Sequence, residues 1–178
     1  AVQGDVEAQK ELGSMYLKGA GVSQDYKEAA KWYKLAAEQG DAEAQKELGS
    51  ISLRKEKTYG EAVKLYQLAT EQGDVEAQYR LGLMYDDGYE VPQDYKEAIK
   101  WYRRAAENGH TLARHNLGLM LYKGQGTPQD FKEATKLLKP FGKNYYPSKH
   151  AKWYGLEPNY EYAEAQHALE VMQTAVLN

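Results

Sequence analysis

The sequence predicts an all-α protein, an α-solenoid of about four helical hairpins with a capping half-repeat at its C-terminal end. A Gly-Asp or Gly-His pair recurs at intervals of 36, 33 and 36 residues, and fixed periods of this size are typical of solenoids. Between these pairs apolar residues recur every four residues, which places them on one face of a helix. Each expected second helix begins with a capping pair, namely Asp25/Glu28, Thr58/Glu61, Asp94/Glu97 and Asp130/Glu133.

The bulk properties fit one solenoid domain over residues 1–178 and exclude several function classes. The chain has no cysteine, which removes thiol catalysis, cysteine-based zinc sites and disulfides. No run approaches the roughly 20 apolar residues that span a bilayer, so we expect no membrane insertion. The net charge of −3 disfavours nucleic acid as the partner of the whole chain.

Repeat one covers about residues 4–39 and repeat two about 40–72. In both, a glycine suits the left-handed position past a helix end and the next aspartate caps the following helix. Repeat two is three residues shorter in its inter-helix loop, and Ser52 replaces the tyrosine that stands at position 16 in repeat one. We therefore expect a tighter turn there and a local change in the superhelical path.

Repeat three, about residues 73–108, is the most complete unit, and repeat four covers about 109–141. Gly88 can end the first helix of repeat three, and Pro92 prevents its continuation. Residues 142–160 break the pattern with Pro147, Gly155 and Pro158, and we expect an irregular insert with at most a short helix at 148–154.

Residues 161–178 resume the first-helix pattern. Leu169 falls at the leucine position, whereas Glu170 replaces the glycine and Gln173 the tyrosine. A terminal helix that gains polar residues in this way is typical of a cap. Because AVQG at the start resembles the end of a second helix (compare AEQG at 37–40), we expect that repeats or a cap precede it.

A glycine recurs in the middle of every first helix, where it costs about 1 kcal/mol against alanine in an isolated helix. Its recurrence predicts that another helix passes too close for a side chain. The positions are Gly13, Gly49, Gly82 and Gly118.

The pattern GDxEAQxxLGxMYxxGxGVxQDYxEAxxWYxxAAEQG resembles the Sel1-like repeat, a relative of the tetratricopeptide repeat, over about residues 1–141. The resemblance implies stacked helical hairpins with a concave face, and a non-enzymatic adaptor that binds a partner protein or peptide in that groove. A more specific version is an immunity protein that neutralises a secreted bacterial toxin or effector. No cofactor is implied, and a periplasmic or secreted location is slightly favoured over a cytoplasmic one.

On the tetratricopeptide analogy, four positions of each first helix form the inner surface. Counted from the leucine of that helix, they lie five and two residues before it and two and five residues after it. Repeats one and two present small and charged residues there: Glu7, Lys10, Ser14, Leu17, Glu43, Lys46, Ser50 and Leu53. Repeats three and four present aromatic and apolar residues flanked by charge, which is typical of binding hot spots. We therefore expect the partner-binding centre at Glu76, Tyr79, Arg80, Leu83, Asp86, Asp87, His115, Leu119, Tyr122 and Lys123. The alternative is that Leu83, Leu119 and Tyr122 pack between repeats.

Two other kinds of site are weaker alternatives. Six lysines with interleaved aromatics between residues 131 and 153 could bind RNA or an anionic surface, or form a capping insert or a docking element. The acidic loop of Asp86, Asp87 and Glu90 could serve a carboxylate-dependent hydrolase. His110 and His115 are five residues apart, which does not suit a shared metal. We therefore predict no metal site and no enzyme.

Overall fold

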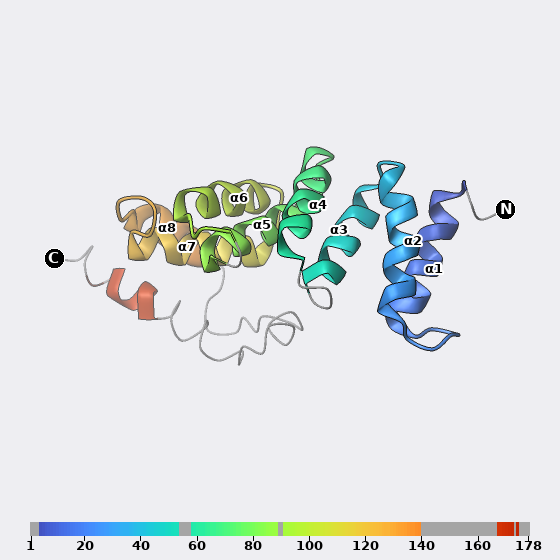
Figure 1. Cartoon of the computed structure of the whole chain (residues 1–178). Coiled ribbons are helices and arrows are strands. Elements are labelled where there is room, and N and C mark those ends of the chain that lie inside the picture. Colours follow the sequence, from blue (N-terminus) through green and yellow to red (C-terminus); the bar gives the residue numbers. More distant parts are fainter. Residues whose placement is uncertain (1–3, 54–57, 89–90, 140–166, 173, 175–178) are drawn as a thin grey trace. The chain divides into compact units, whose positions relative to one another are not determined.

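The computed structural model describes residues 4–53, 58–88, 91–139, 167–172 and 174, and within these residues all regular secondary structure is helical. Along the chain the helices follow one another as the predicted hairpins (Figure 1). The all-α solenoid expected from the sequence is therefore confirmed. The helices are α1 (Val6–Lys18), α2 (Tyr26–Glu38), α3 (Ala42–Ile51), α4 (Tyr59–Glu71), α5 (Val75–Asp87), α6 (Tyr95–Glu107), α7 (Thr111–Lys123) and α8 (Phe131–Leu138).

The chain divides into two compact units, Ala1–Gln93 and Asp94–Asn178. In the first unit each of α1 to α4 packs on the next helix along the chain, and in the second α6 packs on α7 and α7 on α8. Packing between sequence neighbours is how a solenoid builds a continuous core from units that cannot fold alone.

Three of the mid-helix glycines, Gly13, Gly49 and Gly118, lie against the second helix of their own repeat. A Cβ built on Gly13 would lie 3.0 Å from the Tyr33 ring, and one on Gly49 would lie 3.2 Å from Tyr66. In repeat four a Cβ on Gly118 would lie 2.7 Å from Leu138. The predicted close approach is confirmed at these three glycines, since an alanine there would meet a packed side chain.

The Gly-Asp junctions work as expected. Gly40, Gly73 and Gly109 have φ between 87° and 90°, a conformation that glycine adopts without steric cost. The following side chain then accepts a hydrogen bond from an amide in the first turn of the next helix. Asp41 and Asp74 do so at 2.8 and 2.7 Å. In repeat four the His110 imidazole takes over this role, with Nδ1 accepting from the Ala113 amide at 3.1 Å.

The second-helix caps are confirmed in three repeats and wrong in one. The carboxylates of Asp25, Asp94 and Asp130 each accept from one or two first-turn amides. Thr58 makes no side-chain cap hydrogen bond. Its φ of −93° and ψ of 69° also differ from the extended backbone of Asp25 and Asp94.

In the second-helix caps of repeats one and four, the amide of the cap residue bonds to the first helix instead of to the glutamate of the predicted capping box. In a capping box the glutamate would accept from the cap amide. Here the Asp25 amide donates to the Tyr16 carbonyl and the Asp130 amide to the Leu121 carbonyl, both at 3.0 Å. Each loop is thereby held to its own first helix, and the glutamate is left for ion pairs such as Glu97–Lys100 at 3.2 Å.

Buried glutamines connect the two ends of each repeat in the first unit. Gln9 is 0% exposed and Gln45 is 5% exposed. Gln39 Nε2 donates to Gln9 Oε1 at 2.8 Å, and Gln72 Nε2 donates to Gln45 Oε1 at 3.0 Å. These bonds satisfy polar groups that would otherwise be costly to bury.

Several sequence expectations lie outside the described residues. They are the turn of repeat two at 54–57, the irregular insert at 142–160 and most of the expected capping helix. Within that helix, residues 167–172 and 174 are helical, and Leu169 and Met172 are buried. The Thr135 hydroxyl on α8 donates to Met172 Sδ at 3.4 Å, so this turn packs on the last hairpin as a cap would.

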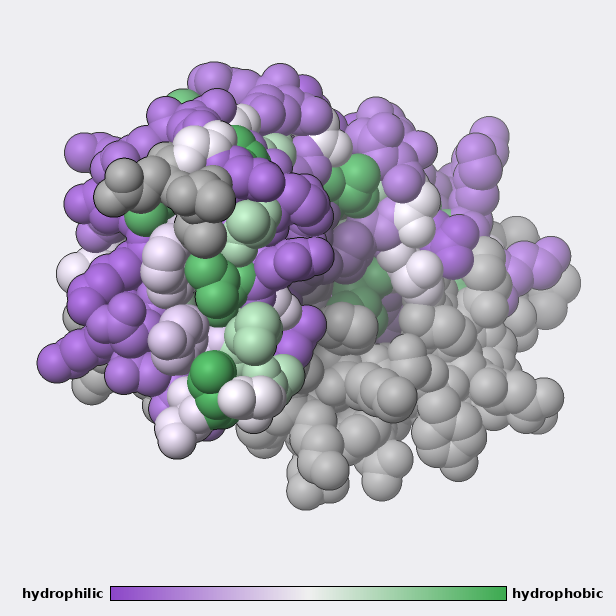
Figure 2. All heavy atoms as spheres, turned by 90° about the vertical axis from the view of Figure 1, so that its right-hand side faces the viewer, coloured by the Kyte–Doolittle hydropathy of each residue, from purple (hydrophilic) through white to green (hydrophobic). Residues whose placement is uncertain are grey.

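The surface on the side of α1 and α2 is mostly hydrophilic, with a narrow strip of hydrophobic residues through it (Figure 2). Consistent with this, the apolar residues Val6 and Leu12 of α1 are half-buried rather than buried.

Candidate partner-binding site

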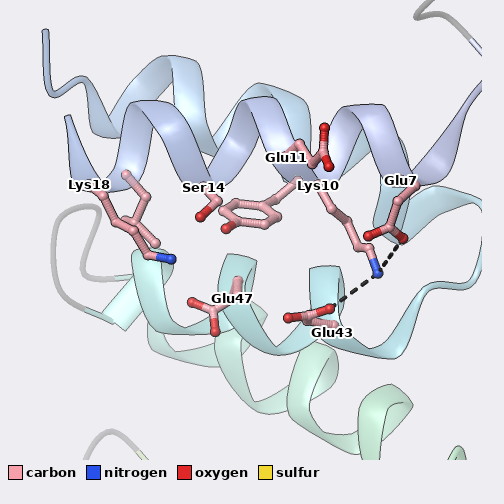
Figure 3. Close-up of a pocket in the computed structure, with 9 residues that line it drawn as sticks. Glu7, Lys10, Glu11, Ser14, Lys18, Glu43 and Glu47 are labelled. Carbon is pink, nitrogen blue, oxygen red and sulfur yellow. Dashed lines mark hydrogen bonds and ion pairs between the residues drawn. The ribbon is translucent and has the colours of Figure 1, made fainter. Parts of the chain in front are cut away.

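A cavity of about 210 Å³ lies between α1 and α3 in the first unit (Figure 3). Tyr33 of α2 also contributes to its wall, and its remaining lining comes from the first helices of repeats one and two. Five of the eight inner-surface positions expected for these repeats line it, so the repeat phase does bring these side chains together. The lining residues are Glu7, Lys10, Glu11, Ser14, Leu17, Lys18, Tyr33, Glu43 and Glu47.

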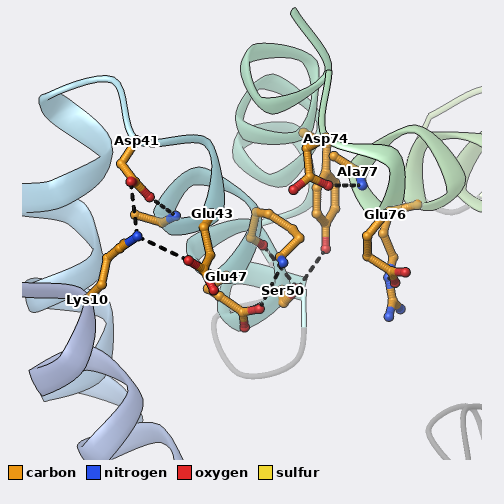
Figure 4. A network of polar contacts seen from close by, with 12 residues as sticks. Lys10, Asp41, Glu43, Glu47, Ser50, Asp74, Glu76 and Ala77 are labelled. Carbon is orange, nitrogen blue, oxygen red and sulfur yellow. Dashed lines mark hydrogen bonds and ion pairs between the residues drawn. The ribbon is translucent and has the colours of Figure 1, made fainter. Parts of the chain in front are cut away.

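One end of the cavity is closed by Lys10. Its ammonium lies 3.0 Å from Glu7 Oε2 (Figure 3). It also lies 3.1 Å from Glu43 Oε2 and 3.3 Å from Asp41 Oδ2 (Figure 4). Hydrogen bonds to Glu7, and then to Glu43 and Asp41, raise the pKa of Lys10 above its ordinary value. The cluster therefore links repeat one to repeat two through one cation that three carboxylates share.

Tyr33 is 4% exposed. Burial, and secondarily the charge of Glu47, raises the pKa of its hydroxyl to about 12, while a hydrogen bond with Ser14 acts in the opposite direction. Repeat two has the same arrangement, because the hydroxyls of Ser50 and Tyr66 lie 3.1 Å apart. A serine two residues after the leucine thus satisfies the buried tyrosine of the same repeat.

The lining of the cavity is acidic, with four glutamates against two lysines. Lys10 is already matched by carboxylates, whereas Lys18 is exposed at the C-terminal end of α1. The cavity therefore complements a cation rather than an anion.

The predicted binding residues of repeat three lie on α5, in the first unit. Arg80 Nε donates to Glu76 Oε1 at 2.7 Å, one turn away. Leu83 and Asp86 are half-buried and Asp87 is exposed, and partial desolvation raises the pKa of the Asp87 carboxyl.

Tyr79, which the sequence analysis places at the centre of the surface, is 7% exposed. It therefore offers a partner little surface of its own.

The predicted residues of repeat four lie on α7, in the second unit. His115 is 5% exposed and Leu119 is 9% exposed. Tyr122 is half-buried, with its ring centroid 5.9 Å from that of Phe131 on α8, and Lys123 is exposed. The accessible part of this group is therefore its C-terminal end.

Sequence reasoning missed Glu11, Lys18, Tyr33 and Glu47 as cavity residues. Tyr33 falls on the apolar face of its helix, where its ring packs on Gly13. The recurrence of serine at positions 14 and 50, opposite the tyrosines, is the signal that could have indicated a polar seam.

The remaining site classes find no support within the described residues. No group of three or more His, Asp or Glu side chains there could hold a metal ion. Among the helices that the structure describes, none combines the length and the apolar composition of a bilayer-spanning segment.

Solved structures similar to this chain are repeat solenoids from bacteria. The protective antigen c5321 of uropathogenic Escherichia coli, which displays an SLR fold, matches with a TM-score of 0.76 and 30% identity over 97% of this chain. This chain spans 34% of that antigen. A Sel1 repeat protein from Oxalobacter formigenes matches with a TM-score of 0.74 and 34% identity, over 97% of this chain and 74% of that protein.

A putative Sel1 repeat protein from Klebsiella pneumoniae has a TM-score of 0.56 and 25% identity, over 96% of this chain and 87% of its own. Among curated proteins none matches.

The family model of the Sel1 repeat matches four times in succession, at residues 6–41, 42–74, 75–110 and 111–141. Each match begins two residues after the start expected from the sequence. The repeat fold implies a protein–protein interaction module, and its proteins are typically non-catalytic. With four matched repeats and helical hairpins in the same phase, the chain belongs to the Sel1 repeat family.

Proposed function

We propose that this chain is a non-catalytic module that binds one partner protein or peptide along the face formed by its first helices. The observation that carries the proposal is the cavity between α1 and α3, because inner-surface positions of two successive repeats line it. A recognition surface requires accessible side chains that converge on one cavity.

We propose further that the centre of binding lies on repeats three and four. The residues with accessible surface there are Glu76, Arg80, Leu83, Asp86 and Asp87 on α5 and Tyr122 and Lys123 on α7. Tyr79, His115 and Leu119 are buried and contribute little accessible surface of their own. An aromatic ring beside apolar and charged groups is the usual composition of a hot spot.

A narrower form of the proposal is that the partner is a secreted bacterial toxin or effector, which this chain neutralises as an immunity protein. Such a role requires a tight complex with a single effector, whereas an adaptor would engage several partners more weakly. The stoichiometry and number of captured proteins distinguish the two forms.

The test is affinity capture from a lysate of the source organism, with three baits read by mass spectrometry. They are the wild type, the variant Asp87→Lys/Lys123→Glu, and the control variant Lys34→Glu/Glu38→Lys on α2. Both variants reverse two exposed charges and leave the net charge unchanged. Like charges across an interface weaken binding, so we expect the first variant to retain about tenfold less of the partner.

A single protein kept by the wild type and the control but lost from Asp87→Lys/Lys123→Glu would support binding at this surface. A one-to-one mass by light scattering, with loss of the partner's toxicity, would support the immunity form. A partner kept by both variants would contradict the placement on repeats three and four. No enriched protein with any bait would contradict the function itself.

A further inference from the structure

The second helices of the two units differ in the charge of their side chains. In the first unit, α2 and α4 together carry four basic and four acidic side chains. In the second unit, α6 and α8 with its C-cap Lys139 carry seven basic side chains against three acidic ones. The chain as a whole has a net charge of −3, so these two helices concentrate positive charge on an otherwise acidic molecule.

The cations of α6 and α8 lie on neighbouring parts of one surface. Arg103 of α6 donates to both carboxylate oxygens of Glu133 on α8, with Nη2 at 3.2 Å from Oε2, so the two helices lie side by side here. On α6 the exposed residues Lys96, Lys100 and Arg104 recur every fourth residue. With a rise of about 1.5 Å per residue, they form a row with a spacing of about 6 Å.

Most of these cations have no carboxylate partner among the described residues. Lys100 pairs with Glu97 at 3.2 Å, and Arg103 pairs with Glu133. The other basic side chains of this surface are exposed and make no ion pair within the part of the chain that the structure describes. They are Lys96, Arg104, Lys132, Lys136 and Lys139. Their charge is therefore available to a partner, unlike that of Lys10, which three carboxylates share.

The surface lacks the apolar anchor with which a helix binds a membrane surface. Within the described part of the chain the exposed large hydrophobic residues are Leu35, Leu68 and Val171, none of which lies on α6 or α8. Arg104 stands at the repeat position that Leu35 and Leu68 occupy in α2 and α4. Anionic lipid is therefore a poorer match to this surface than a water-soluble acidic partner.

Single-stranded nucleic acid is a poorer match as well. Such a ligand stacks its bases on aromatic side chains, and the aromatic residue between the cations of α6 is Trp101. Its ring is half-buried, and Lys100 and Arg104 lie over it at 5.6 and 5.9 Å from the centroid. Cations of the chain itself thus occupy the ring on which a base would stack.

We propose that the outer face of α6 and α8 binds an acidic segment of a partner protein. An extended segment with a carboxylate at every second residue has a spacing of about 6–7 Å, which matches the row on α6. Ammonium and guanidinium groups donate charge-assisted hydrogen bonds to such carboxylates, and the complementary charge also speeds association. The face belongs to second helices, so the proposal goes beyond the binding site on the first helices and does not depend on it.

The test uses two blocked octapeptides, one of glutamate and one of glutamine. Each is titrated into the ¹⁵N-labelled full chain, and amide chemical shifts are followed. We expect the glutamate peptide to shift the amides of Lys100, Arg104 and Lys136, and the glutamine peptide to leave them unchanged. Raising the salt concentration from about 20 to about 200 mM should weaken the glutamate peptide several-fold, because salt screens exposed charges.

The matched variants are Lys100→Glu/Lys136→Glu on this face and Lys31→Glu/Lys64→Glu, which change the same repeat positions on α2 and α4. All four lysines are exposed, and Lys31 and Lys100 each pair with the glutamate three residues earlier. The two variants therefore change the net charge equally and lose the same local contact. We expect Lys100→Glu/Lys136→Glu to weaken the glutamate peptide about tenfold, and the control to weaken it less than about twofold.

Equal weakening by the two variants would overturn the proposal, because binding would then follow the net charge rather than this face. Equal affinity for the glutamate and glutamine peptides would also overturn it. Two further probes test the choice of partner. If octauridylate bound more tightly than the glutamate peptide, or if the chain sedimented with phosphatidylserine vesicles but not with phosphatidylcholine vesicles, and Lys100→Glu/Lys136→Glu abolished that binding, the acidic protein segment would be replaced by nucleic acid or by lipid.

Discussion

The first helices of repeats one and four occupy the same place in the repeat but differ in what they bury. In α1 the buried residues are Gln9 and Gly13. In α7 seven residues are buried, including His115 and Leu119, whose counterparts in repeat one are the half-buried Lys10 and Ser14. The repeat therefore determines where a side chain lies within its hairpin, whereas accessibility depends on what covers each hairpin.

The contact between the two helices of a repeat, which we call the seam, is also more polar in repeats one and two than in repeat four. In repeat two the Tyr66 hydroxyl lies 3.1 Å from Ser50, and in repeat one Ser14 bonds with Tyr33. In repeat four the equivalent residues are Leu119 and Leu138, both buried. A buried hydroxyl needs a partner, and in repeats one and two a serine provides it, whereas repeat four has leucine at both positions. The polar seam is what leaves hydroxyls beside the cavity in the first unit.

The largest expected effect comes from truncating the second-helix residue at the seam. Tyr66 and Leu138 are both 0% exposed. Replacement by alanine leaves a cavity and should lower the free energy of unfolding by about 3–5 kcal/mol at Tyr66 and about 2–5 kcal/mol at Leu138. Urea unfolding followed by far-UV circular dichroism measures both. The control is Leu68→Ala on α4, which is 46% exposed and should cost less than about 1 kcal/mol.

A more conservative substitution, Tyr66→Phe, isolates the contribution of the tyrosine hydroxyl to stability. Tyr66→Phe keeps the ring and leaves Ser50 without its hydroxyl partner, so we expect a loss of about 1 kcal/mol. If Tyr66→Phe were as stable as the wild type, the Ser50–Tyr66 contact would have no energetic part in the difference between the repeats.

Gly118→Ala should destabilise repeat four by about 1–3 kcal/mol, because the new Cβ would lie 2.7 Å from Leu138 and the side chain must shift. Gly60→Ala on α4 is the control, since nothing lies within 4 Å of its added Cβ, and it should gain about 0.5–1 kcal/mol. Both are measured by the same urea unfolding.

A double-mutant cycle tests whether the contact with Leu138 causes the loss of stability in Gly118→Ala. In the Leu138→Ala background Gly118→Ala should cost less than it does alone, because the clashing side chain is gone. Additive effects would mean that the recurrent glycine has a role other than close packing.

The sequence predicts what depends on spacing within one hairpin. The Gly13 and Gly118 contacts and the Asp25 cap follow from three- and four-residue periods, which the sequence displays directly. The family match begins two residues after each expected start, so the phase of the repeats was also accessible from the sequence.

Contacts between repeats and the degree of burial were not accessible. The three carboxylates around Lys10 come from two repeats, and their approach depends on how the hairpins stack rather than on any local pattern. Tyr79 occupies an inner-surface position but is 7% exposed, and a single repeat cannot show what covers it. Thr58 fits the capping pattern but makes no side-chain cap bond, and the pattern does not display its φ of −93° and ψ of 69°.

Another prediction concerns alkaline pH, where a buried tyrosine between the helices of a repeat can titrate and a leucine cannot. Burial raises the pKa of Tyr33 to about 12 and also raises that of Tyr66, against an ordinary value of about 10. Between these values the unfolded chain loses the protons that the folded chain keeps, so stability falls as pH rises. In Tyr33→Phe/Tyr66→Phe the fall from pH 10 to 12 should be shallower by about 2 kcal/mol.

Urea unfolding at a series of pH values tests this slope. Lys10 contributes a decrease in the same direction, because its carboxylate partners raise its pKa, but it is present in both proteins and cancels in the comparison. Parallel curves for the wild type and the double variant would show that the buried tyrosines do not carry the alkaline sensitivity.

The smallest expected effect comes from a substitution that gives repeat two the side-chain helix cap of the other repeats. The Asp25 carboxylate accepts from the Lys27 and Glu28 amides at 2.9 and 3.2 Å, whereas Thr58 makes no side-chain cap bond. Asp25→Ala should cost about 1 kcal/mol. Thr58→Asp should gain about 0.5 kcal/mol, since a carboxylate also interacts favourably with the helix N-terminus.

The two substitutions together decide whether the backbone or the side chain limits the cap of repeat two. Thr58→Ala is the reference: if Thr58 contributes nothing as a cap, this variant should match the wild type within about 0.5 kcal/mol in urea unfolding. A gain in Thr58→Asp would mean that the loop still lets a carboxylate reach the first-turn amides. An unchanged Thr58→Asp would place the limit in the backbone at φ −93° and ψ 69°, so that the three-residue deletion, rather than the choice of threonine, makes repeat two the exception.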